Sequence, residues 1–221
     1  MKLLARGDDN VRMHRTLSPL AWWRFAPRRD RVETDNICTE SGALLAAEAL
    51  KTLSRHGLLH AQTMEIKSWR QPGNKVSASL VAVRLASATE ESIRGSLDRE
   101  SKHRSAFPTR VGFHGTGNVY DEAENVQTVD DLVVLSLSMD VELAVQVSTN
   151  VDIWLPYDLR AREQRSISER NRPRLTAALL EISALDVMVS SSEITKFAVT
   201  DNLHVRNHTN SFGQPVPVLP L

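Results

Sequence analysis

An alternating run of apolar residues between positions 132 and 148 constrains the fold more than any other feature of this chain. Every odd-numbered residue from Val133 to Val147 is apolar, and most even-numbered residues between them are polar or charged. A period of two predicts β-strands with one face in the core and the other toward solvent. We therefore expect the side chains to fall into two sets. The buried set comprises Val133, Leu135, Leu137, Leu143, Val145 and Val147, and the more exposed set comprises Ser136, Ser138, Glu142 and Gln146.

The run is longer than an ordinary strand, because strands usually have about 3 to 10 residues. We expect a turn near residues 139–142, with Asp140 in it. A loop of odd length or a β-bulge keeps the same side chains inward on both sides of that turn. Residues 151–155 continue the phase and predict a further strand, in which Trp154 lies on the polar face with Asp152.

Other segments predict three helices, two hairpins and an extended tail. Apolar spacing and capping residues predict helices over 41–56 and 89–103, and a third from near Asn171 to about Ala184, since Pro173 is tolerated best in a first turn. Hairpins are expected over 64–85, with a turn at 72–74, and over 197–205. Residues 110–114 predict a short strand before a glycine-containing turn. The proline-containing C-terminal tail is expected either along the body or free.

This order of elements predicts an α+β fold. Consecutive strands favour antiparallel pairing, so we expect a mostly antiparallel sheet with about three helices packed on one face. Residues 1–35 are expected to form an irregular basic and aromatic arm, and residues 36–221 a single α+β domain or two sub-domains meeting near 105–130. The aromatic cluster at 22–25 either anchors the arm on the domain or stacks on nucleic-acid bases.

Charge is segregated along the chain although its total is balanced, with 27 basic and 27 acidic residues. A net charge of zero argues against general binding to nucleic acids or membrane surfaces. Residues 111–159 contain nine acidic residues and no Lys or Arg, and an arginine-rich stretch follows at 160–174. Either the two stretches pair within the fold, or the acidic one forms a surface that steers a cationic partner.

The leading functional interpretation is a non-enzymatic protein-binding module that engages a basic partner protein through an acidic sheet surface. In charge and size such a chain is similar to bacterial immunity proteins, which neutralise toxic nucleases. An aromatic anchor ringed by charge is typical of an interface hot spot. The candidate partner-binding residues are Asp152, Trp154, Tyr157, Asp158, Asp140 and Glu142.

An enzyme is the alternative interpretation. The string His114-Gly115-Thr116-Gly117 resembles the element of ADP-ribosyltransferases that contacts the nicotinamide ribose. This resemblance implies a nucleotide-dependent enzyme, with Tyr120 as the aromatic residue of a second strand and Glu142 as the catalytic glutamate. The other reading of the string is a plain turn, and we expect His114 not to be catalytic. A second alternative is nucleic-acid binding by the basic N-terminal arm, which the balanced total charge disfavours.

The sequence predicts neither a metal site nor a cofactor. The histidine pair 56/60 straddles Gly57 at the end of a predicted helix, and the pair 204/208 lies outside any predicted helix. The acidic run at 121–131 lacks the ligand spacing of a calcium loop. Cys38 is the only cysteine, so no disulfide forms within the chain. No apolar stretch approaches the ~20 residues of a membrane span, and we expect a cytoplasmic protein that does not bind membranes. The sequence does not define an oligomeric state.

Overall fold

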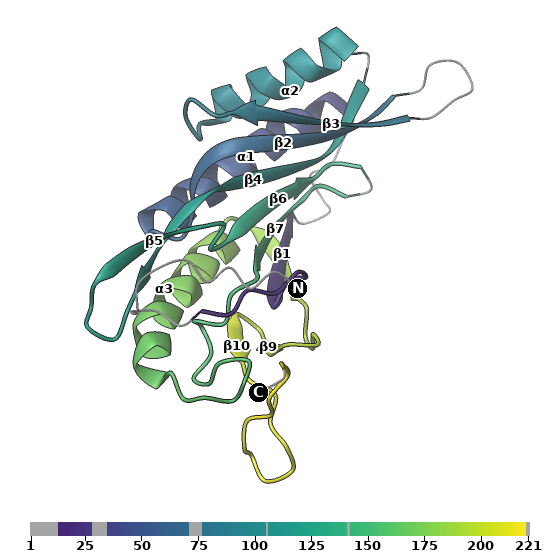
Figure 1. Ribbon diagram of the computed structural model, residues 1–221. Helices are drawn as coiled ribbons and strands as arrows, with labels where there is room; N and C mark the ends of the chain where they lie inside the picture. Colours follow the sequence, from purple (N-terminus) through teal and green to yellow (C-terminus); the bar gives the residue numbers. More distant parts are fainter. Residues whose placement is uncertain (1–12, 28–34, 71–76, 105, 141, 220–221) are drawn as a thin grey trace.

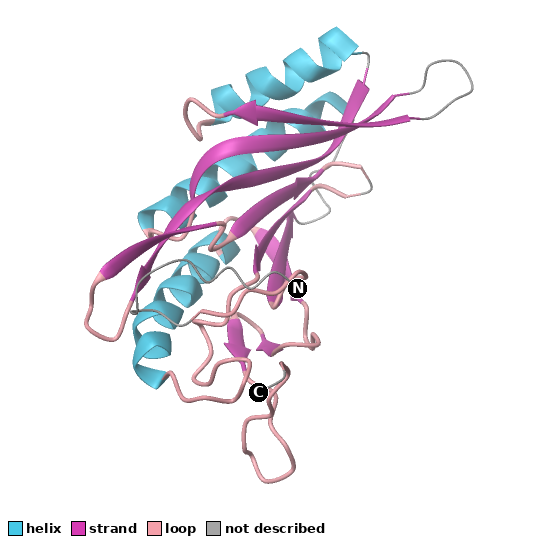
Figure 2. Cartoon of the chain, viewed as in Figure 1, coloured by secondary structure: helices cyan, strands magenta, loops and turns pink. Residues whose placement is uncertain are grey.

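The computed structural model describes residues 13–27, 35–70, 77–104, 106–140 and 142–219 (Figure 1). Within these residues it contains three helices, a large antiparallel sheet and a two-stranded sheet, which confirms the predicted α+β class (Figure 2). The helices are α1 (Asp35–Arg55), α2 (Glu90–Arg104) and α3 (Arg165–Ser183). The strands of the large sheet are β1 (Ala21–Pro27), β2 (His60–Arg70), β3 (Ser77–Arg84), β4 (Ala106–Tyr120), β5 (Val126–Asp130), β6 (Val134–Ser138), β7 (Ala144–Thr149) and β8 (Val187–Ser191).

The strands of the large sheet are ordered β3-β2-β4-β6-β7-β1-β8, and β5 pairs with the far end of β4. Strand β4 crosses the region where two sub-domains were considered, and it pairs with β2, β5 and β6. The sheet is therefore continuous through β4 and β5. Strands β9 (Val199–Asp201) and β10 (His204–Arg206) form the small hairpin predicted at 197–205.

Helix α1 lies between the other two helices, and all three cover the apolar face of the sheet. It packs against β2, β6 and β7; α2 contacts α1 and β4, and α3 contacts α1, β4 and β8. At Gly42 in α1, a Cβ atom would lie 3.1 Å from the Leu143 side chain and 3.4 Å from that of Leu137. The helix therefore sits close against the inward side chains of β6 and the following loop.

The alternating run behaves as its period predicts. The six odd-numbered residues expected in the core are buried, while Ser136, Ser138 and Gln146 are partly exposed and Glu142 is exposed. Strands β6 and β7 pair so that Ser138 lies opposite Ala144, and the loop of residues 139–143 between them contains Asp140. Its odd length preserves the phase of the buried face, as expected.

Residues 21–27 were expected within an irregular arm, and this prediction is wrong. They form β1, an interior strand that pairs with β7 on one side and β8 on the other. Trp23 and Phe25 are buried in the core, while Trp22 and Arg24 lie on the half-exposed side. Two adjacent tryptophans made the alternation of buried and exposed residues hard to recognise in the sequence, because only Trp23 of the two faces the core. The rest of the basic arm, residues 1–12 and 28–34, lies outside the described residues.

Two further predictions are corrected by tertiary contacts. Residues 152–155 form turns instead of a strand, and Leu155 donates its N–H to the Asp152 carbonyl at 2.9 Å. Helix α3 begins at Arg165, so Pro173 lies inside it. Proline has no N–H, so the carbonyl of Glu169, four residues earlier, receives no helical hydrogen bond. Both Pro173 and Glu169 are exposed to solvent. Water can therefore satisfy that carbonyl, which explains why the helix continues.

The remaining elements follow the sequence closely. The hairpin of β2 and β3 is present, although its predicted turn at 72–74 lies outside the described residues. Thr89 precedes α2 and accepts the Ser92 N–H at 3.4 Å, as a capping residue does. The C-terminal tail lies along the body up to residue 219, because the N–H groups of Val218 and Leu219 both bind the Leu159 carbonyl. No helix in the described part of the chain is both long enough and apolar enough to cross a membrane.

Candidate functional site

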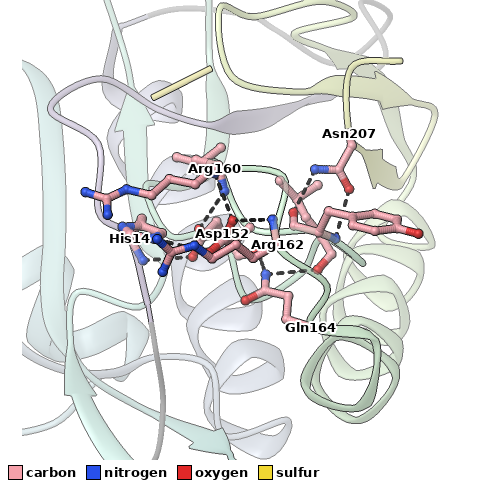
Figure 3. Close-up of polar contacts among 10 residues, drawn as sticks. His14, Asp152, Arg160, Arg162, Gln164 and Asn207 are labelled. Carbon is pink, nitrogen blue, oxygen red and sulfur yellow. Dashed lines mark hydrogen bonds and ion pairs between the residues drawn. The ribbon is translucent and has the colours of Figure 1, made fainter. Parts of the chain in front are cut away.

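The corner formed by residues 152–164 contains four of the predicted partner-binding residues (Figure 3). At its centre Asp152 accepts the His14 N–H on Oδ1 at 2.9 Å and the Leu159 N–H on Oδ2 at 3.1 Å. Gln164 donates its side-chain amide to the Asp152 carbonyl at 2.7 Å. The residue is 0% exposed, and this burial raises the pKa of its carboxyl group to about 6. Asp152 is therefore an internal support that no partner protein can reach.

Trp154 was predicted to be an exposed interface anchor, and this prediction is wrong. It is 0% exposed and donates its indole N–H to Thr149 Oγ1 at 2.8 Å. Its carbonyl accepts the Ser168 hydroxyl at 3.0 Å, which attaches the turn to the first part of α3. The tight turn at 152–155 buries residues on both sides of the chain, so the strand phase does not determine where this ring points.

Asp158 and Tyr157 complete the corner. The Asp158 carboxylate is 3% exposed; it accepts the N–H groups of Arg160 and Arg162 at 2.8 and 2.9 Å and lies 3.4 Å from His14 Nε2. Tyr157 is partly buried, and its backbone is held on both sides by the Asn207 side-chain amide. The four predicted residues do lie together, but they stabilise the fold and offer no charged interface.

Three residues that hold the corner in place were not identified from the sequence: His14, Gln164 and Asn207. His14 lies 138 residues from Asp152, and Asn207 lies 50 residues from Tyr157. A single polar residue carries no periodic signal, so the sequence alone offered no sign of these contacts.

Asp140 and Glu142 lie in the loop before β7, whereas the corner follows its far end. Both are exposed; Asp140 accepts the Ser138 hydroxyl at 3.2 Å, and Glu142 forms an ion pair of 2.9 Å with Arg24. They therefore do not join Asp152 and Trp154 in one site, as the sequence interpretation required.

The acidic stretch contacts the arginine-rich stretch at Arg170. Asp121 is buried and binds Ala123 and Asn125, and the hydrogen bond from the Asn125 side chain is the main cause of its lowered pKa. Arg170 bonds to the carbonyls of Asp121 and Glu122, and its guanidinium lies 3.3 Å from the Glu124 carboxylate. Asp121, Asp152 and Asp158 are buried, so these three carboxylates are not part of an exposed acidic face.

The segment from His114 to Gly117 was predicted to be a turn after a strand, and it instead lies within the long strand β4. A Cβ atom at Gly115 would lie 2.0 Å from the His60 carbonyl oxygen, and one at Gly117 would lie 2.3 Å from that of Leu58. These glycines are required by the close approach of the chain at the start of β2. Gly115 donates its N–H to Asp131 at 3.2 Å, so this group does not point to an open phosphate site.

His114 lies on the uncovered face of the sheet between two carboxylates. Its Nδ1 is 3.2 Å from Asp131 Oδ1 and its Nε2 is 3.8 Å from Glu65 Oε2. Gly112 makes room for the ring, because a Cβ there would lie 3.2 Å from His114 Nε2. The described residues contain no group of three His, Cys, Asp or Glu side chains that could hold a metal ion.

The uncovered face of β2, β3 and β4 carries exposed large apolar side chains. Trp69 pairs with Ala78 on one side and with Phe107 on the other, and Leu80 lies diagonally across from Trp69, beside Lys67. Trp69, Leu80 and Phe107 are 42%, 67% and 73% exposed. Side chains at these cross-strand positions are close enough to form one patch. We call Trp69, Ala78, Leu80 and Phe107 the apolar patch.

Basic residues accompany the apolar patch. Lys67, Arg84 and Arg110 are exposed on the same face, and none has an ion pair with a described residue. The Lys67 ammonium lies 6.0 Å from the centroid of the Trp69 ring. Glu65 is the carboxylate on this part of β2, two residues before Lys67. The described face around the apolar patch is therefore positively charged.

Comparisons of this chain with protein-family models, with curated proteins and with solved structures found no match.

Proposed function

We propose that this protein is a non-enzymatic protein-binding module that uses the uncovered face of β2, β3 and β4. One observation carries the proposal: the side chains of Trp69, Leu80 and Phe107 are exposed together on adjacent strands. Exposed apolar clusters rimmed by polar groups mark interaction sites, because burying them against a partner removes apolar surface from water. Trp and Arg, both present here, are also enriched among interface hot spots.

The charge around the apolar patch indicates the chemistry of the partner. Lys67, Arg84 and Arg110 form no ion pair with a described residue, and the nearby Glu65 carboxylate lies 3.8 Å from His114 Nε2. A complementary surface presents an apolar pocket for the patch and acidic residues around it. The earlier expectation of a basic partner, and of an immunity-type inhibitor that neutralises one, depended on an acidic sheet face. Because Asp152 and Asp158 are buried and Glu142 is paired with Arg24, we propose instead a partner with an acidic rim.

A photo-crosslinking experiment tests the proposal in cells that express the protein. A benzoylphenylalanine is placed at Phe107 in one variant and at Ile194, which is 72% exposed outside the large sheet, in a matched control. The protein captured from Phe107 and not from Ile194 is identified, purified and titrated against the wild-type chain.

The same titration is repeated with three variants. Phe107→Ser combined with Leu80→Ser should weaken binding by about tenfold or more, since each removes a buried contact at the interface centre. Lys67→Glu combined with Arg110→Glu should slow association and reverse its salt dependence. Ile194→Ser should leave the affinity unchanged.

Three results would overturn the proposal. They are equal crosslinking at both positions, an affinity that the apolar-patch variants do not change, and capture of a second copy of the same chain. Tight, salt-sensitive binding of single-stranded poly(dT), lost in Phe107→Ser, would assign the face to nucleic acid instead, because aromatics with nearby cations also stack on bases.

A further inference from the structure

A pocket of ≈ 470 Å³ lies between the corner, α3 and the C-terminal region. It is lined by Tyr157 from the corner, Arg172 from α3, Arg206 from β10, and His208 and Pro215 from the chain that follows. Pockets that bind small ligands have volumes of about 300–1,000 Å³. This volume is therefore large enough for a small organic molecule, and the site lies away from the apolar patch.

Arg172 is the most informative residue of the pocket wall. It is partly buried, and its guanidinium has no hydrogen bond or ion pair with any described residue. A guanidinium placed in a pocket wall without a partner retains five N–H donors for a ligand, in a planar arrangement that matches carboxylate or phosphate oxygens.

A second arginine, Arg206, strengthens the positive character of the pocket. Arg206 forms an ion pair of 2.9 Å with Asp201, and both side chains are mostly exposed. An exposed ion pair is weak, so the Arg206 guanidinium can also bind a ligand. His208 contacts the Thr195 carbonyl through Nε2 at 2.8 Å. No carboxylate occurs among the described residues that line the pocket.

An apolar and aromatic wall accompanies the cations. Pro156, Val199, Pro215 and Tyr157 all line the pocket. Tyr157 is fixed in place, because Asn207 bonds to its N–H and carbonyl and Arg165 donates to its hydroxyl at 3.0 Å. A held aromatic ring beside two arginines is suited to a ligand that combines a planar ring with an oxyanion.

We infer that this pocket binds a small phosphomonoester that carries a planar ring, of which a nucleoside monophosphate is the type. Arg172 and Arg206 bind the phosphate oxygens, and the apolar wall around Tyr157 contacts the ring. The inference does not depend on the proposed protein-binding function, since the two sites share no residue.

Isothermal titration with 5′-AMP, adenosine and inorganic phosphate tests the site. We expect saturable binding of AMP with a Kd of about 1 mM or tighter, and weaker binding of the two fragments, because each supplies only part of the contacts. Arg172→Gln should weaken AMP binding by about tenfold or more, since it removes a charge-assisted contact to the phosphate. Circular dichroism and thermal unfolding check that the variant is folded.

Arg162→Gln is the matched control, because Arg162 is exposed, lies in the same corner and does not line the pocket. It removes the same charge and should leave AMP binding unchanged. Absence of AMP binding, equal affinity for AMP and inorganic phosphate, or equal weakening by Arg162→Gln and Arg172→Gln would each overturn the inference.

Discussion

His14 and Asp152 exchange two hydrogen bonds across 138 residues of sequence. The His14 N–H binds Asp152 Oδ1 at 2.9 Å, and the Asp152 N–H binds the His14 carbonyl at 3.3 Å. The segment before β1 is thereby fixed to the corner that precedes α3. A buried carboxylate is used for this purpose even though burial opposes its charge.

Replacing Asp152 by Asn should remove one component of the pH dependence of stability. Burial raises the pKa of Asp152 from 3.8 to about 6, so the folded state holds this proton more tightly than the unfolded state. Its contribution to the free energy of unfolding is complete below pH 3.8 and is lost as the pH rises through about 6. The free energy of unfolding of the wild type, relative to that of Asp152→Asn, should therefore fall by on the order of 3 kcal/mol between pH 4 and pH 7. Urea unfolding of both proteins across this pH range measures the difference in their free energies of unfolding. A difference that stays constant or rises with pH would contradict a raised pKa for Asp152.

Trp154→Phe should destabilise the fold by about 2–4 kcal/mol, because it leaves a cavity and removes the donor to Thr149. Trp22→Phe is the control, since Trp22 lies half-exposed on β1 and its ring is not enclosed by the core. It should cost less than about 1 kcal/mol. Denaturant unfolding compares the two, and similar losses in both variants would show that Trp154 is not a core residue.

Gly115→Ala should destabilise the protein by more than about 2 kcal/mol, because its Cβ would meet the His60 carbonyl and β2 would have to move. Gly95 in α2 has no atom within 4 Å of an added Cβ. Gly95→Ala should instead stabilise the protein by up to about 1 kcal/mol, since alanine favours the helix. Thermal unfolding measures both, and a neutral Gly115→Ala would mean that β4 and β2 are not in close contact there.

His114→Ala should leave the protein folded and should not reveal a nucleotide site in β4. The side chain is partly exposed and its contacts are with Asp131 and Glu65 at the surface, so the expected loss is under about 1 kcal/mol. Titration of NAD into the wild type and the variant provides the functional readout. Saturable binding that His114→Ala abolishes would contradict this expectation and support the ADP-ribosyltransferase resemblance.

Much of the fold could be predicted from the sequence because local periodicity reflects burial. The run from Val133 to Val147 predicted the buried and exposed faces of β6 and β7, with either an odd-length loop or a bulge between them. Capping at Thr89 and apolar spacing predicted the helices. These patterns are informative because the side chains of a strand or a helix return to the same face at a fixed number of residues, independently of the rest of the chain.

The candidate site could not be predicted in the same way. Trp154 lies in phase with polar residues, but a turn replaces the strand and buries it. The apolar patch brings Trp69, Leu80 and Phe107 together from three strands, and none of them is unusual in its own segment.

The sequence by itself determined the class of fold, the alternation of the central strands and the separation of acidic and basic stretches. Only the tertiary structure decided which charges are neutralised, which aromatic residues are covered and which face of the sheet stays open. Burial and pairing depend on residues far apart in the chain, as His14 and Asp152 show. Periodicity describes neighbours along one element, so it carries no information about which distant group will lie opposite them.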